Sequence, residues 1–182
     1  MQKKGYTTKE SKIVYKSPYI SVREDLIDDE LGREKIFNVV DLQYGTSILV
    51  IDKNNDIYFV KQYRYGYQDY TLEFPGGTMD KNEEPEDTIK RELFEELGIK
   101  AENITSLGFV SGLTSNLNHK EYLFFTKVDY VPEIVEDKTE DVLECIKMSF
   151  SDAIKMVLEN KIIHAPAVAL ILKTKTFLEN NR

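Results

Sequence analysis

Several short stretches of the chain alternate apolar with polar residues or carry β-branched residues, and this period of two predicts β-strands. Turn-forming residues separate some of them: Asp28–Gly32 lies between the second and third stretches, and Lys53–Asn55 joins the fourth and fifth as a hairpin. The expected strands are Lys12–Lys16, Ile20–Ile27, Lys35–Asp41, Ser47–Asp52, Asp56–Gln62, Ile104–Ser111, Tyr122–Val128 and Val142–Met148.

A helical period replaces this alternation in three places. Pro85 suits the first position of a helix, and Gly98 suits the residue just past its last turn. Near the C-terminus, Ser151 is the expected N-cap of a helix over Asp152–Glu159, and Pro166–Leu178 is expected to form a more apolar helix.

The helix that begins at Pro85 separates its side chains onto two sides. At about 100° per residue, its aliphatic and aromatic residues share one side, and Glu92, Glu95 and Glu96 share another. Like charges three and four residues apart destabilise a bare helix, so a positive group is expected beside them. Carboxylate oxygens suit Mg²⁺, Mn²⁺ or Ca²⁺ rather than zinc, although a solvated acidic face is the commoner meaning of such a pattern taken alone.

Composition narrows the class of protein. The chain has 182 residues, 41% of them hydrophobic, which is enough for one main domain with one good core. A net charge of −8 and the lack of a basic run argue against a nucleic-acid-binding surface. The N-terminus resembles no signal peptide, no apolar run could span a membrane, and the single Cys145 cannot form an internal disulfide, so we expect a cytoplasmic protein.

The segment Gly77–Ile99 has the spacing G-x5-E-x7-R-E-U-x-E-E-x-G-U, where U is aliphatic. It therefore resembles the Nudix box at every specified position. These positions are Gly77, Glu83, Arg91, Glu92, Leu93, Glu95, Glu96, Gly98 and Ile99. The resemblance implies an α/β fold, a Nudix α/β/α sandwich with a mixed sheet. It also implies metal-dependent hydrolysis of a nucleoside diphosphate linked to another group, with Mg²⁺ or Mn²⁺ as the cation.

The resemblance implies different roles for the box residues. Glu92, Glu95 and Glu96 would be metal ligands, with Glu95 and Glu96 also catalytic, while Glu83 and Arg91 would support the box. Gly77 and Gly98 would serve its backbone.

Two further segments resemble patterns of the ADP-ribose pyrophosphatase branch. Lys61–Arg64 is similar to R-Q-Y-R, and Leu72–Gly77 is similar to L-E-x-P-A-G with Gly76 in place of Ala. The resemblance implies that Arg64 and Glu73 bind substrate and that the Gly76 carbonyl is a metal ligand. A surface ion pair is the alternative for Arg64. Tyrosines lie in the same neighbourhood and could stack on a base or simply pack: Tyr63, Tyr65, Tyr67 and Tyr70.

Two loops are expected to complete the site. Gly112–Lys120 lacks the Pro and Gly of the S-P-G-x-x-x-E loop found in that branch, and His119 falls near the position of its Glu, so it is a candidate substrate-binding residue. In the acidic loop Asp129–Asp141, the resemblance implies that Glu140 is a general base and Asp141 a further metal ligand. A solvated loop is the alternative for each of these residues.

The first three strands would form a small antiparallel β-meander ahead of the box domain. A meander of this size is marginal alone, so its apolar face must pack against other structure. We expect residues 1–45 to be this meander and residues 46–182 to be the hydrolase domain. In dimeric members of the ADP-ribose branch such a sheet contributes to the subunit interface, so the resemblance implies a homodimer.

The resemblance to the ADP-ribose branch implies conversion of ADP-ribose to AMP and ribose 5-phosphate. The nearer alternative is a Nudix hydrolase of nucleotide sugars, dinucleoside polyphosphates or damaged nucleoside triphosphates. A different class, a non-catalytic sensor of ADP-ribose or another nucleotide, is disfavoured because all the box carboxylates are present.

Overall fold

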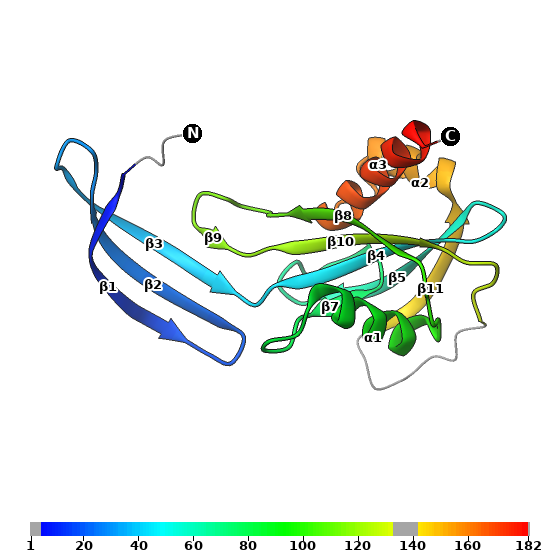
Figure 1. The fold of residues 1–182 in the computed structure, drawn as a ribbon, viewed down its shortest axis with the longest axis horizontal. Coiled ribbons are helices and arrows are strands. Elements are labelled where there is room, and N and C mark those ends of the chain that lie inside the picture. Colours follow the sequence, from blue (N-terminus) through cyan, green and yellow to red (C-terminus); the bar gives the residue numbers. More distant parts are fainter. Residues whose placement is uncertain (1–4, 133–141, 182) are drawn as a thin grey trace. The chain divides into compact units, whose positions relative to one another are not determined.

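The computed structural model describes residues 5–132 and 142–181, and its contacts divide them into two compact units (Figure 1). The N-terminal unit comprises the described residues up to Tyr44 together with Ser111–Lys120. The box unit comprises Gly45–Val110 and the described residues from Glu121 onward. The loop that follows the box thus belongs with the first strands of the chain.

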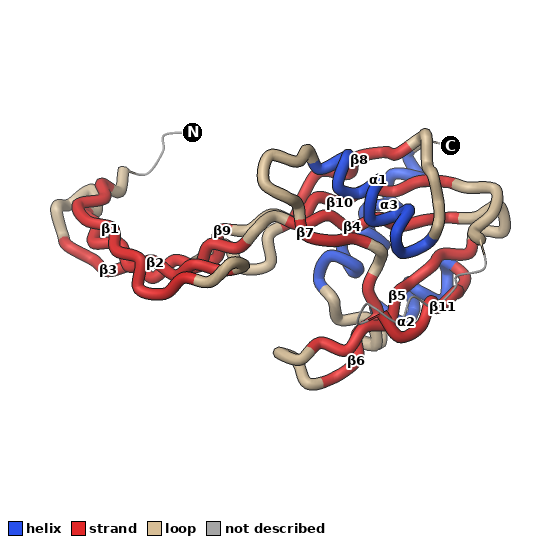
Figure 2. The backbone as a smooth tube through the Cα atoms, turned by 90° about the horizontal axis from the view of Figure 1, so that it is seen from below, coloured by secondary structure: helices blue, strands red, loops and turns tan. Residues whose placement is uncertain are grey.

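The N-terminal unit is a sheet in the order β1-β2-β3-β9. Its strands are β1 (Thr7–Lys16), β2 (Ile20–Asp28), β3 (Glu34–Leu42) and β9 (Leu117–Asn118). The first three pair antiparallel, as the alternation predicts, and each extends beyond its expected bounds. The short β9 lies beside β3 (Figure 2) and pairs parallel with it, and sequence alternation gave no indication of this pairing.

A charged network covers part of this sheet. Arg23 donates to Asp25 through Nε at 2.9 Å and to Asp41 through Nη1 at 2.8 Å. Asp41 also accepts a hydrogen bond from Asn118 Nδ2 at 2.7 Å. The 111–120 loop is therefore tied to β3 through its side chains as well as its backbone.

The box unit contains a mixed sheet in the order β11-β5-β4-β10-β8, with β6 beside β5 and β7 beside β4. Only β4 and β10 run parallel among these pairs. The strands are β4 (Gly45–Ile51), β5 (Asp56–Arg64), β6 (Asp69–Glu73), β7 (Gly76–Thr78), β8 (Ile104–Val110), β10 (Glu121–Lys127) and β11 (Val142–Ser149).

Helices cover both faces of this sheet, with α1 (Pro85–Leu97) on one side and α2 (Phe150–Leu158) and α3 (Ala165–Asn180) on the other (Figure 1). Successive residues of β4 point to opposite faces. Ile48 and Val50 pack with Ile89 and Leu93 of α1. The intervening Leu49 and Ile51 join a second cluster that includes Leu170 and Ile171 of α3. The predicted α/β/α sandwich is confirmed.

The helix ends follow the local rules, with one correction. Pro85 begins α1, and Gly98 ends it in the left-handed region at φ 65°, as expected. Ser151 is not the cap of α2: the Oγ of Ser149 accepts the Asp152 N–H at 3.1 Å, because β11 runs directly into the helix. Among the described residues, no helix is long and apolar enough to cross a membrane.

Candidate active site

Strand β7 brings the glycines of the box against α1. It pairs antiparallel with the start of β4, and the N–H of Ile48 donates to the carbonyl of Pro75 at 2.8 Å. A Cβ atom on Gly76 would meet the carbonyl of Thr46, and one on Gly77 would meet the carboxylate of Glu92. Close approach of β7 to the backbone of β4 therefore explains Gly76, and close approach of β7 to Glu92 of α1 explains Gly77.

The carboxylates of α1 gather around this strand. Glu96 Oε2 accepts the N–H of Gly76 at 3.2 Å, and Glu92 lies against Gly77. Arg91 supplies the positive group that the acidic helix requires: its Nη1 donates to Glu92 at 2.7 Å and to Glu95 at 3.2 Å. The box thus brings the carboxylates of Glu92 and Glu96 against β7, and Arg91 pairs with Glu92 and Glu95.

Glu83 holds the other end of the Arg91 guanidinium. Its Oε2 lies 3.3 Å from Nη2 of Arg91 and accepts the N–H of Asp80 at 3.0 Å. Hydrogen bonds from Arg91 and Asp80 lower the pKa of Glu83 to about 2, and the same pairing raises the pKa of Arg91. The loop that precedes α1 is therefore fastened to the helix through this ion pair.

The chemistry of this donor set fits a hard divalent cation. Glu96 offers a carboxylate oxygen beside Gly76 and Glu92 offers one beside Gly77, and no nitrogen or sulfur ligand lies among the box donors. In the parts of the chain that the structure describes, no three acidic, His or Cys side chains form a preassembled cluster. Mg²⁺ is commonly bound through one or two carboxylates together with substrate phosphates, so two such oxygens suffice.

Arg64 and Glu73 form a forked ion pair on neighbouring strands β5 and β6. Arg64 Nε and Nη2 each donate to one oxygen of Glu73 at 2.7 Å. The Glu73 side chain is 6% exposed, whereas the Arg64 side chain is 50% exposed. Burial opposes ionisation of Glu73, but hydrogen bonds from Arg64 and Thr71 and the nearby His164 lower its pKa overall. Arg64 therefore presents a fixed, half-exposed guanidinium.

His164 also reaches this pair. Its Nε2 lies 3.3 Å from Glu73 Oε2. Sequence spacing could not have revealed this contact, because the two residues are far apart in the chain and only the packing of α3 against β6 joins them.

His119 and its neighbour lie in the N-terminal unit. The Nδ1 of His119 is 2.8 Å from the carbonyl oxygen of Gln43, and its ring contacts that of Tyr44 at 6.5 Å between centroids. Asn118 binds Asp41. These partners belong to the N-terminal unit, and the predicted substrate role of His119 remains a prediction.

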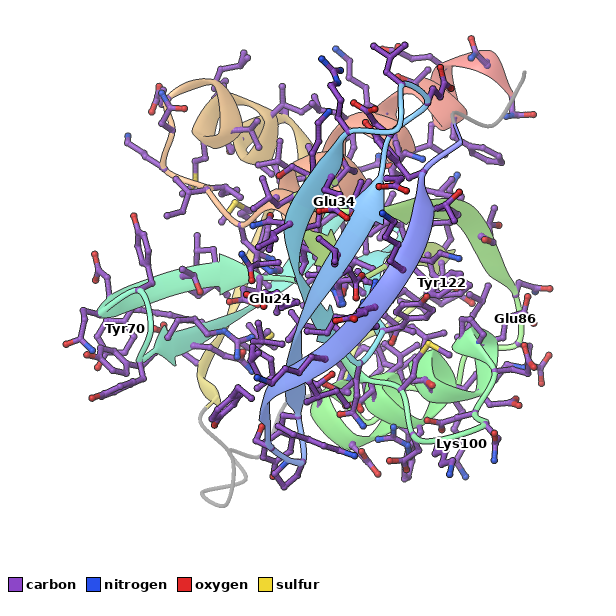
Figure 3. The ribbon with its side chains drawn as sticks, turned by 90° about the vertical axis from the view of Figure 1, so that its left-hand side faces the viewer. Glu24, Glu34, Tyr70, Glu86, Lys100 and Tyr122 are labelled. Atoms are coloured by element: carbon purple, nitrogen blue, oxygen red, sulfur yellow. The ribbon has the colours of Figure 1, made fainter. Side chains whose placement is uncertain are left out.

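Four tyrosines lie on the hairpin formed by β5 and β6. Tyr63 and Tyr70 contact edge to face with ring centroids 5.3 Å apart, and Lys61 lies over the Tyr70 ring at 5.4 Å. Figure 3 shows Tyr70 on this hairpin, and Tyr65, at 83% exposed, is the most open of the four. The rings present exposed aromatic surface.

Three further residues from the sequence analysis are Glu140, Asp141 and Cys145. Glu140 and Asp141 lie outside the described residues. Cys145 is half-buried on β11, and burial, with the negative charges of Glu96 and Glu144, raises the pKa of its thiol to about 11. A thiol with that pKa is protonated at neutral pH, as expected for a packing residue.

Comparisons with known proteins agree with this architecture. The family model described as NUDIX domain matches residues 41–171. ADP-ribose pyrophosphatase of Bacillus subtilis is 28% identical over 122 residues, which is 66% of each chain. GDP-mannose pyrophosphatase of Yersinia enterocolitica is 28% identical over 161 residues, covering 81% of this chain and 82% of the relative.

A solved structure described as an ADP compounds hydrolase superposes with a TM-score of 0.85 over 100% of this chain and 98% of that one. At 19% identity, this likeness concerns the fold alone. The family match extends over most of the chain and includes the complete box on α1. The chain belongs to the Nudix family, and its intact box marks it as a pyrophosphohydrolase of that family.

Proposed function

We propose that the protein hydrolyses the pyrophosphate bond of ADP-ribose with the help of Mg²⁺, giving AMP and ribose 5-phosphate. The proposal rests on two sites in the box unit. At the first, carboxylate oxygens of Glu92 and Glu96 lie beside Gly77 and Gly76. At the second, Glu73 fixes the half-exposed guanidinium of Arg64. The similarity to the Bacillus subtilis ADP-ribose pyrophosphatase supports this choice of substrate.

The chain's residues would divide the reaction as follows. Glu92, Glu95 and Glu96, with the Gly76 carbonyl, would hold the cation, and Arg64 would bind a phosphate oxygen. When bound, the cation neutralises phosphate charge and lowers the pKa of a water ligand. One water adds to phosphorus as the bridging P–O bond breaks, so one phosphate stays on each product. Glu95, Glu96 or Glu140 would accept the water's proton.

A nucleotide sugar is the second candidate substrate. The GDP-mannose pyrophosphatase of Yersinia enterocolitica aligns over more of this chain than the Bacillus subtilis enzyme does. In addition, the 111–120 loop lacks the S-P-G sequence typical of the ADP-ribose branch and is tied to the N-terminal sheet. Both substrates share a nucleoside diphosphate, so the proposed chemistry is common to them.

A substrate panel with two arginine variants tests the proposal. We expect Mg²⁺-dependent release of AMP from ADP-ribose to exceed turnover of GDP-mannose, dinucleoside polyphosphates and nucleoside triphosphates. Arg64→Ala should raise KM for ADP-ribose by about 10- to 100-fold, because a guanidinium contact to phosphate is lost. Products are identified by mass and KM is measured at saturating Mg²⁺.

The control is Arg33→Ala, which removes an exposed arginine paired with Asp29 in the N-terminal unit and should leave KM unchanged. Preference for GDP-mannose would move the assignment to the nucleotide-sugar branch. Tight nucleotide binding without turnover would instead support a sensor, and an unchanged KM in Arg64→Ala would remove Arg64 from the substrate site.

We also propose that the protein is a homodimer formed through the N-terminal sheet. Every residue of β1 is exposed within the chain, and β1 and β3 carry exposed Ile13, Tyr15 and Ile36. A four-stranded sheet that leaves such residues in water gains little hydrophobic stabilisation, and a second copy would cover them.

Ile13→Glu should therefore shift the dimer toward monomer. We expect sedimentation equilibrium of the wild type to give twice the 21.1 kDa chain mass, and the variant to approach the single-chain mass at micromolar concentration. Leu158→Glu, which changes an equally apolar residue exposed on α2, is the matched control and should remain dimeric. A monomeric wild type would refute the proposal.

A further inference from the structure

We propose that His164 is a positioning residue that holds Glu73, and through it Arg64, in the orientation that binds substrate phosphate. The inference rests on the proposed function, since it assumes that Arg64 contacts the substrate. It extends that function to a residue outside the box and outside both neighbouring sequence patterns.

Glu73 is the hub of the cluster. Its Oε1 accepts hydrogen bonds from Arg64 Nε and from the hydroxyl of Thr71, and its Oε2 accepts one from Arg64 Nη2. His164 Nε2, at 3.3 Å from Oε2, is the remaining described partner of the carboxylate. A buried carboxylate is costly unless its lone pairs are satisfied, so each donor helps to keep Glu73 ionised and in place.

The backbone of His164 is fixed independently of its ring. His164 is the N-cap residue of α3, and its carbonyl accepts the N–H of Val168 at 3.0 Å. Its side chain makes no capping hydrogen bond to the helix. The imidazole therefore points to Glu73 from a rigid helix start, and its position does not depend on loop order.

The protonation state of His164 suits a donor. Burial lowers its pKa, an effect that the charges of Glu73 and Glu121 oppose and that of Arg64 reinforces. The lowered pKa favours the neutral ring, which carries one N–H. Its Nδ1 is buried without a partner in the described part of the chain, whereas Nε2 faces a carboxylate, which accepts but cannot donate. The proton accordingly belongs on Nε2.

The forked ion pair with Glu73 sets the orientation of the Arg64 guanidinium. Two parallel N–H···O bonds fix the plane of the guanidinium only while the carboxylate itself keeps its orientation. A substrate phosphate would compete with Glu73 for the guanidinium of Arg64. The hydrogen bond from Thr71 and the proposed contact from His164 Nε2, 3.3 Å away, hold Glu73 still, so that Arg64 can gain a phosphate contact without leaving its place on β5.

Two substitutions separate positioning from packing. His164→Leu keeps an apolar ring-sized group but removes the donor, and we expect KM for ADP-ribose to rise about five- to tenfold with kcat within about twofold. His164→Gln places an N–H near the position of Nε2 and should restore KM to within about twofold of the wild type. Lys161→Gln, an exposed change just before α3, is the control and should alter neither constant.

A spectroscopic measurement tests the contact without activity. The chain contains two histidines, so NMR titration of the imidazole signals resolves His164 from His119. Glu73→Gln removes the negative charge beside His164 and should lower the His164 pKa further, while the His119 signals stay unchanged.

The outcomes distinguish this inference from the proposed function. If the wild type turns over and Arg64→Ala raises KM, then a wild-type KM in His164→Leu, or a His164 pKa unmoved by Glu73→Gln, overturns the role of His164 alone. If the wild type hydrolyses no member of the panel, or if Arg64→Ala leaves KM unchanged, the proposed role of Arg64 fails and the role of His164 fails with it. Raised KM in His164→Leu, rescue by His164→Gln and the shifted pKa together support it.

Discussion

Replacing Glu96 with glutamine (Glu96→Gln) should lower kcat by about a thousandfold or more while the protein remains folded. Glutamine has the shape of glutamate and keeps a carbonyl oxygen that can accept the Gly76 N–H, the contact that Glu96 makes at 3.2 Å. What it loses is the negative charge. A carboxylate that holds a divalent cation and one that accepts a proton from water both require this charge, so either role predicts a large effect on turnover.

The measurement is kcat on the preferred nucleotide of the panel, together with the thermal unfolding midpoint and the affinity for Mn²⁺ followed by electron paramagnetic resonance. Glu86→Gln is the matched control, because Glu86 is an exposed glutamate in the first turn of the same helix (Figure 3). It should keep wild-type kcat and Mn²⁺ affinity, with a small loss of helix stability of about 0.3–1 kcal/mol. Wild-type turnover in Glu96→Gln would remove Glu96 from the reaction.

The helix that carries Glu96 was predictable because its information is local. Pro85 and Gly98 mark its two ends, and the period of its apolar residues places Leu93 in the core. The clustering of carboxylates on one side likewise predicted a compensating cation, which the structure identifies as Arg91. Sequence reasoning therefore succeeded where neighbours in space are neighbours in the chain.

Sequence patterns were less informative where contacts join segments that are distant in the chain. The parallel pairing of β9 with β3 depends on a two-residue strand, too short to show alternation. The contact between His164 and Glu73 depends on how α3 packs against β6, which no periodicity specifies. The cap of α2 was misplaced by two residues, since both Ser149 and Ser151 are suitable caps and only the end of β11 decides between them.

Gly77→Ala is expected to lower kcat by about a hundredfold with little loss of stability. The Cβ of alanine would meet the carboxylate of Glu92, which is the end of a flexible side chain and can move, rather than backbone, which cannot. Gly77 has no positive φ, so alanine adds no backbone strain. Displacing Glu92 would move a proposed cation ligand by about an ångström, and misplacement on that scale is enough to cost about two orders of magnitude.

The kinetic and unfolding measurements are compared with those of Gly66→Ala, a glycine with open space at its Cβ position, which should keep wild-type activity. A double-substitution cycle then tests the mechanism. In a Glu92→Ala background, Gly77→Ala should cost little further, because the carboxylate that it displaces is already gone. If the two substitutions instead reduced kcat independently, Gly77 would act on the site through something other than Glu92, and the close approach of β7 to α1 would need another explanation.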